Sequence, residues 1–137
     1  MQRLGISKET TWLDLKNGVR VRVRPLYGPI YWAAQNRAQR YFSAFQEGLT
    51  AQIAAGADPA SLPDLERQET KDGWYQHFFV QALAEEGIIE WENVEGADGQ
   101  PVKPDVLAIA ELMEIPAQAQ AFFIAYTQPY NAVVEEG

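Results

Sequence analysis

Hydrophobic and polar positions alternate most clearly over residues 10–26, where two strand-like segments flank Lys16-Asn17-Gly18. This pattern predicts a β-hairpin. A two-residue Asn-Gly loop would mix leucines and arginines on one face, whereas a three-residue loop with Gly18 in the left-handed region separates an apolar face from a polar one. We therefore predict the second register. Its cross-strand pairs are Leu15 with Val19, Leu13 with Val21, Thr11 with Val23, Asp14 with Arg20 and Trp12 with Arg22. On the polar face they favour an ion pair and a cation–aromatic contact.

A long amphipathic helix is predicted over residues 29–55, because apolar residues recur every three or four positions from Tyr31 to Ile53. Pro29 suits the first turn, where proline loses no needed hydrogen bond. Such a helix is about 40 Å long and outreaches a core of this size. It therefore either projects from the body or breaks near Gly48. Residues 56–63, rich in Gly, Pro and Asp, are predicted to form a loop.

The remainder is predicted to be a helical part over residues 64–129, followed by a fraying tail over residues 130–137. A second helix begins at Leu65, a third opens at Pro104-Asp105, and a fourth begins after Pro116 and stops at Pro129. The short apolar run Ile88–Trp91 suits either a strand or a buried helical turn. The predicted fold is thus a single, mainly α domain of the α+β class, with an N-terminal β-hairpin followed by about four helices.

Composition is consistent with one ordinary globular domain of 137 residues, 47% hydrophobic and 22% charged. Without cysteine there is no disulfide, thiolate metal site or cysteine nucleophile. No apolar run approaches the roughly 20 residues of a membrane span, and the first residues lack the apolar stretch of a secretory signal. The sequence therefore predicts a protein with no membrane association, located in the cytoplasm.

Charge is distributed unevenly along the chain. Residues 1–40 hold eight basic residues against two acidic ones, a net +6, whereas the rest holds three against seventeen, a net −14. An overall charge of −8 disfavours general nucleic-acid binding. A basic strand on an acidic body suits self-association or a protein partner.

Reactive groups are few, and we predict no enzymatic activity, no cofactor and no metal site. The only histidine, His77, has no neighbouring acid to orient it, so a structural role is favoured over that of a base or ligand. The acidic run Glu85–Glu95 matches no calcium-loop spacing and is interpreted as a solvated acidic face. No glycine-rich phosphate-binding motif occurs.

The arginines of the second strand, Arg20, Arg22 and Arg24, are the best functional candidates on chemical grounds. Guanidinium groups in a row can contact phosphates or an acidic protein surface. The alternative is that they pair within the molecule, with Asp14 and with acids from the helices, and the overall negative charge favours this alternative slightly.

Residues from Ile89 onward resemble those of tail assembly chaperones of long-tailed bacteriophages and prophages. The resemblance rests on Trp91-Glu92-Asn93-Val94, on Asp98-Gly99-Gln100-Pro101-Val102, on Pro104-Asp105 opening a helix, and on Phe122-Phe123 before Pro129. The N-terminal hairpin ending in Arg24-Pro25-Leu26, followed by a long helix, is also similar. The sequence differs from the usual pattern in having Lys103 before Pro104-Asp105, where a Ser or Thr cap is more typical.

The resemblance implies a non-enzymatic protein that binds the tape measure protein, keeps its long hydrophobic helices soluble while the tail tube forms, and then leaves. The tail tube protein is a further possible partner, as is a second copy of the chain. The rival hypothesis is a structural virion component, a tail completion or head–tail connector protein that forms an oligomeric ring. A nucleic-acid regulator using the arginine strand is a third. Predicted protein contacts are Trp32, Tyr41 and Phe45 on the long helix, Phe123 and Tyr126 near the C-terminus, and Arg20, Arg22 and Arg24.

Overall fold

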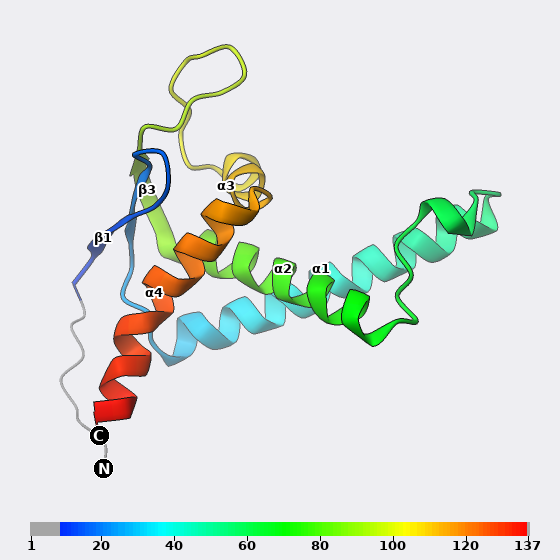
Figure 1. Ribbon diagram of the computed structural model, residues 1–137, viewed down its shortest axis with the longest axis horizontal. Coiled ribbons are helices and arrows are strands. Elements are labelled where there is room, and N and C mark those ends of the chain that lie inside the picture. Colours follow the sequence, from blue (N-terminus) through cyan, green and yellow to red (C-terminus); the bar gives the residue numbers. More distant parts are fainter. Residues whose placement is uncertain (1–8, 137) are drawn as a thin grey trace.

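A computed structural model describes the backbone of residues 9–136 and the side chains of residues 9–128, and it confirms a single domain of the α+β class. A three-stranded antiparallel sheet packs against helices (Figure 1). The elements in chain order are β1 (Thr11–Asp14), β2 (Arg20–Val23), α1 (Gly28–Ala54), a 3-10 turn (Pro59–Ser61), α2 (Gln68–Gly87), β3 (Ile88–Glu92), α3 (Val106–Met113) and α4 (Pro116–Glu136).

The hairpin has the predicted register. Thr11 pairs with Val23 and Asp14 with Arg20, and the amide of Leu15 donates to the carbonyl of Val19 at 2.8 Å. Gly18 has a φ of 75°, as the three-residue loop requires, and Asn17 also has a positive φ of 57°. Segregation of apolar and polar side chains onto two faces therefore sets the register of the hairpin.

The run Ile88–Trp91, which the sequence left open, is a strand within residues 64–129, a part predicted to be helical. It forms β3, which pairs antiparallel with β2, so that β2 is the central strand of the order β1-β2-β3. The core face of the sheet includes Val21 and Val23, both almost fully buried. Pairing with β2 gives the backbone of this run the partners that a helical turn would otherwise have supplied.

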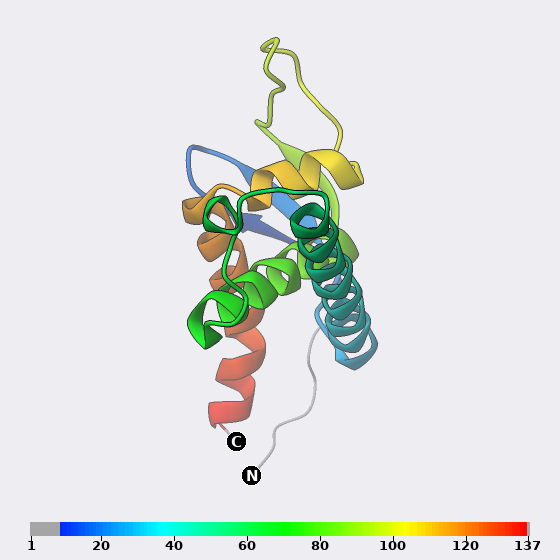
Figure 2. The ribbon, with the colours of Figure 1, turned by 90° about the vertical axis from the view of Figure 1, so that its right-hand side faces the viewer.

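Helix α1 is continuous through Gly48, so the predicted break does not occur. It lies against α2, and the two form a helical pair that extends away from the sheet (Figure 1). Its predicted apolar stripe is buried at Ala34, Ala38 and Leu49, while Ile53, beyond the end of α2, is 47% exposed. The far part of the helical pair, with the connection over residues 55–67, lies at the opposite end of the molecule from the sheet in Figure 1 and faces the viewer in Figure 2. Of the two alternatives predicted for the long helix, projection from the body of the protein is therefore the one found.

The two C-terminal helices begin as predicted but end differently. The Asp105 carboxylate accepts from the amide of Ala108 at 2.8 Å, so Asp105 itself caps α3, and no Ser or Thr is needed there. The prediction that Pro129 ends the fourth helix is wrong, because α4 continues to Glu136 through most of the predicted tail. Proline inside a helix removes one amide donor and strains one turn, and here the helical path continues past it.

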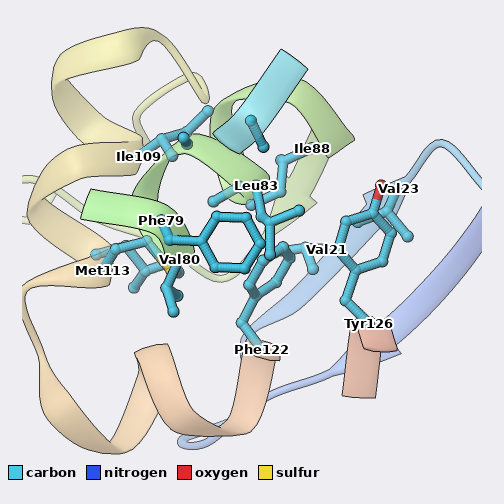
Figure 3. Packing of buried hydrophobic residues seen from close by; sticks show 14 of the residues in the cluster. Val21, Val23, Phe79, Val80, Leu83, Ile88, Ile109, Met113, Phe122 and Tyr126 are labelled. Atoms are coloured by element: carbon cyan, nitrogen blue, oxygen red, sulfur yellow. The ribbon is translucent and has the colours of Figure 1, made fainter. Parts of the chain in front are cut away.

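The core lies where α2, α3 and α4 meet the apolar face of the sheet (Figure 3). Phe122 of α4 and Leu83 of α2 are fully buried at its centre. Each buried side chain of this size contributes roughly 1.5–3 kcal/mol through removal of apolar surface from water. Among the residues described, no single helix is long and apolar enough to cross a membrane; α3 with the first part of α4 reaches that length and hydropathy, but the pair is bent by 102°.

One close approach joins three separate segments of the fold. Helix α2 passes directly into β3 at Gly87, and the carbonyl of Gly87 accepts from the amide of Arg24, just after β2, at 2.9 Å. The ring of Tyr126 from α4 lies over Gly87 so closely that a Cβ there would be 2.5 Å from its hydroxyl oxygen. That hydroxyl donates to the carbonyl of Arg24 at 2.9 Å. Glycine is therefore required at this position.

We expect Gly87→Ala to lower the free energy of unfolding by about 1–3 kcal/mol. The new methyl group displaces the buried Tyr126 ring and breaks its hydrogen bond, which outweighs the gain in helix propensity. Gly48→Ala, at a helical position where a Cβ meets nothing within 4 Å, should instead raise stability by about 0.5–1 kcal/mol. Urea unfolding of both variants measures the difference, and equal stabilisation by both would contradict this account.

Candidate protein-binding site

The polar face of the sheet carries two rows of side chains that run across all three strands. In the first row Arg20 lies between Asp14 of β1, at 2.9 Å, and Glu92 of β3, at 3.6 Å. Its guanidinium carbon also lies 5.0 Å from the centre of the Trp12 ring. The predicted cation–aromatic contact of Trp12 is therefore made by the diagonal Arg20 and not by Arg22. Diagonal neighbours on one face of a sheet are within reach of long side chains.

The other two strand arginines are also engaged within the molecule. Arg22 pairs with Glu90 of β3 at 2.5 Å and donates to the hydroxyl of Thr10 at 3.2 Å. Arg24 donates to the carbonyl oxygen of Glu86 at 2.7 Å. The internal pairing considered from the sequence is thus the arrangement found, although the acids come from strands β1 and β3 and not from helices. Each of the three arginines thus has a partner within the molecule, although Arg24 remains exposed and Arg20 is only half-buried.

The acidic run that was interpreted as a solvated face is only partly so. The side chain of Glu85, on α2, is 1% exposed, and its carboxylate accepts from Tyr41 at 2.6 Å and from Arg37 at 3.3 Å, both on α1. Gln81 donates to its other oxygen at 3.3 Å. Arg37 also bonds Glu86. The interpretation is wrong for Glu85, because α1 covers this carboxylate and supplies the donors that a buried charge requires.

Tyr41 was expected to contact a partner, and its hydroxyl is instead directed at Glu85. Burial, and then the hydrogen bond and negative charge of Glu85, raise the pKa of Tyr41 to about 12. The neutral phenol is a donor to the carboxylate, whereas a phenolate beside it would be repelled. Tyr41 therefore links α1 to α2 and has an internal role.

The remaining aromatic residues predicted on α1 divide between an interior and a surface position. Phe45 stacks on Trp74 of α2, with ring centres 4.2 Å apart, and meets Phe78 edge to face at 5.7 Å. It holds the projecting helices together. Trp32 is 62% exposed and touches only Tyr31 among the ring contacts of the described residues. Of the three, Trp32 is the one with a large free surface.

The two C-terminal aromatic residues face inward. Phe123 is partly buried and meets Phe79 edge to face, with ring centres 6.3 Å apart. Tyr126 is 2% exposed and belongs to the contact over Gly87. The prediction that Tyr126 contacts a partner is therefore corrected, because its ring and hydroxyl are both used in the core.

The largest exposed apolar side chains of the C-terminal half were not among the predicted contacts. They lie on α3, on α4 and at the junction between them: Val106 (61% exposed), Leu107 (77%), Ile115 (50%) and Ile124 (52%). We call these four residues the α3–α4 apolar set. A sequence signal for them exists, because only Glu111 and Glu114 are charged between Val106 and Gln128. In a chain of net charge −8 this segment is low in charge, and it carries four of the large apolar side chains that are exposed.

The single histidine of the sequence lies on α2. His77 packs its ring against Trp74 and Phe78, with centres 5.9 and 5.4 Å away. Within the part of the chain that the structure describes, no three His, Cys, Asp or Glu residues are placed to hold a metal ion. Comparison with protein-family models, with curated proteins and with solved structures finds no match for this chain.

The raised pKa of Tyr41 predicts a loss of stability at high pH. The folded state holds this proton more tightly than the unfolded chain, whose tyrosines titrate near pH 10. The contribution of Tyr41 is thus complete below about pH 10 and is lost as the pH rises through about 12. Absorbance titration at 295 nm should show that the number of late-titrating tyrosines falls by one in Tyr41→Phe. An unchanged number in this variant would contradict the assignment to Tyr41.

The neighbouring acids Glu85 and Glu86 form a matched pair for mutation, since both bond Arg37 but only Glu85 is almost completely enclosed. Glu85→Ala should lower the free energy of unfolding by about 2–4 kcal/mol, because it leaves Tyr41 and part of Arg37 without an acceptor. Glu86→Ala should cost about 1 kcal/mol or less. Denaturant unfolding of the two variants measures the free energy that each loses. Equal losses would show that burial of Glu85 has no energetic effect.

Proposed function

We propose that this protein is a non-enzymatic tail assembly chaperone of a long-tailed bacteriophage or prophage. In this role it binds the tape measure protein reversibly in the host cytoplasm, keeps its apolar helices soluble while tail tube protein is added, and is absent from the finished particle. The proposal begins from the resemblance of residues 89–129 and of the N-terminal hairpin and long helix to that family.

The observation that carries the proposal is the α3–α4 apolar set. Four aliphatic side chains, each at least half exposed, lie on a segment with two charged residues in all. Contact with an apolar helix would remove them from water, at roughly 25 cal/mol per Å² of apolar surface buried. Exposed apolar side chains on a strongly acidic protein suit a contact that must form and later release.

Internal pairing of the arginine strand adds support. A nucleic-acid regulator would need its arginines available for phosphates, and here Arg20, Arg22 and Arg24 are held by Asp14, Glu92, Glu90 and a main-chain carbonyl. Protein binding through an apolar surface does not require them.

The decisive experiment is co-expression of the chain with the tape measure protein of the same genome. Soluble co-purification of the two, together with absence of the chain from mature particles by mass spectrometry, is the expected result. A stable ring that persists in purified particles would favour the structural virion component. Recovery of neither complex nor ring would remove both hypotheses.

The double variant Leu107→Glu/Ile124→Glu tests the surface itself. Both side chains are exposed, so the fold should keep its melting temperature, whereas charges on the contact should lower soluble recovery of the client about 10-fold or more. Ile53→Glu, at the far end of α1 and 47% exposed, is the matched control and should bind normally. If the control loses as much binding as the double variant, the contact does not depend on α3 and α4.

A further inference from the structure

A groove lies between the first half of α2 and the corner at which α3 ends. Its volume is about 530 Å³, and most of its lining is apolar. It is lined by Glu69, Thr70, Gly73, Trp74 and His77 of α2 and by Glu114, the C-cap residue of α3. The sequence pattern did not predict that Glu114 would lie near the first half of α2.

One lining residue of this groove is Gly73, in the interior of α2. Glycine there weakens a helix, and no contact within the molecule requires it, because a Cβ at this position meets nothing within 4 Å. The space beside Gly73 is therefore open. A backbone without a side chain allows another element to approach closely.

The walls of the groove have the chemistry that suits a cation. Trp74 presents an indole ring, held in place by Phe45 stacked at 4.2 Å, and Glu69 and Glu114 supply carboxylates. Glu69 has a long contact of 3.6 Å with Arg67, and both of these side chains are well exposed. Lysine and arginine bind to indole faces and carboxylates. Neither Arg67 nor Lys71, the basic residues nearest to Glu69 in the sequence, lines the groove, so a cation inside it is best supplied by a partner.

Leu107 does not line the groove, but it lies on the same side of α3 as the lining residue Glu114. The two are both exposed and seven residues apart in the sequence, a spacing that returns to the same side of a helix. A partner helix that covers Leu107 can therefore reach Glu114 and, beyond it, Gly73. The partner would need an apolar stripe for Leu107, a small residue opposite Gly73 and a cation beside Trp74.

We propose that this groove binds an amphipathic α-helix of the client, whose apolar stripe is bordered by lysine or arginine. This inference rests on the proposed chaperone function for the existence of a client. It adds where the client binds and which side chains it presents. The apolar stripe covers Leu107, and one basic side chain lies between Trp74, Glu69 and Glu114. A helix bordered by acidic residues is rejected by the same carboxylates.

Two labelled synthetic helical peptides with one shared Leu/Ala stripe, bordered by lysine in one and by glutamate in the other, test this by fluorescence anisotropy. The lysine-bordered peptide should bind the full-length protein at least about 10-fold more tightly, with affinity falling as salt increases. Gly73→Leu, which fills the groove with a good helix former, and Glu114→Lys should each weaken binding about 10-fold or more. Gly48→Leu also replaces an uncrowded helical glycine, lies outside this groove and should bind as the wild type does.

Circular dichroism and the melting temperature show whether each variant is folded, and Gly73→Leu should melt no lower than the wild type. Equal binding of both peptides, or wild-type affinity in folded Gly73→Leu and Glu114→Lys, would overturn the groove proposal. If the client still co-purifies with these two variants, the chaperone function stands and its contact lies elsewhere. If the lysine-bordered peptide binds as expected while the tape measure protein does not, the groove stands and the chaperone function fails.

Discussion

The contact at Gly87 is the constraint on which the arrangement of helices and sheet depends. Helix α2 becomes strand β3 without an intervening loop, so the direction of the helix fixes the direction of the strand. The main chain of Arg24 bonds Gly87 on one side and Tyr126 on the other. Strand β2, helix α2 and helix α4 therefore meet at this one glycine. A larger residue at Gly87 would push all three apart.

This geometry also explains how a chain with such uneven charge folds without strong internal repulsion. Continuation of α2 into β3 brings the acidic run beside the basic N-terminal part, where Arg20, Arg22 and Arg37 find partners. Most of these pairs lie on the surface and contribute little each, but they neutralise the arginine strand. The acidic excess is then left over the rest of the molecule, and α3 and α4 contribute little charge to it.

Local patterns predicted much of the fold because they act over short distances. The hairpin register followed from the faces of Leu13, Arg20 and their neighbours, and the extent of α1 followed from its period and Pro29. Properties that depend on contacts between distant segments could not be predicted in this way. Ile88–Trp91 is a strand because β2 is beside it, Glu85 is buried because α1 covers it, and Tyr126 is internal because Gly87 makes room. The groove joins Gly73 to Glu114, residues with no relation in sequence. The low charge of residues 106–128, by contrast, was readable from the sequence.

The order of the strands has a consequence for synthesis on the ribosome. Strand β2 pairs with β1 immediately before it, but its other partner is distant, since Arg22 faces Glu90. The nascent hairpin is therefore complete long before β3 emerges, and during that interval one edge of β2 and Arg22, which still lacks Glu90, are open to other chains. Helices α1 and α2 are neighbours in sequence and can pair as soon as α2 is synthesised. Because β3 follows α2 directly, this pairing places β3 beside the free edge of β2. The helical pair thus sets the time at which the sheet closes.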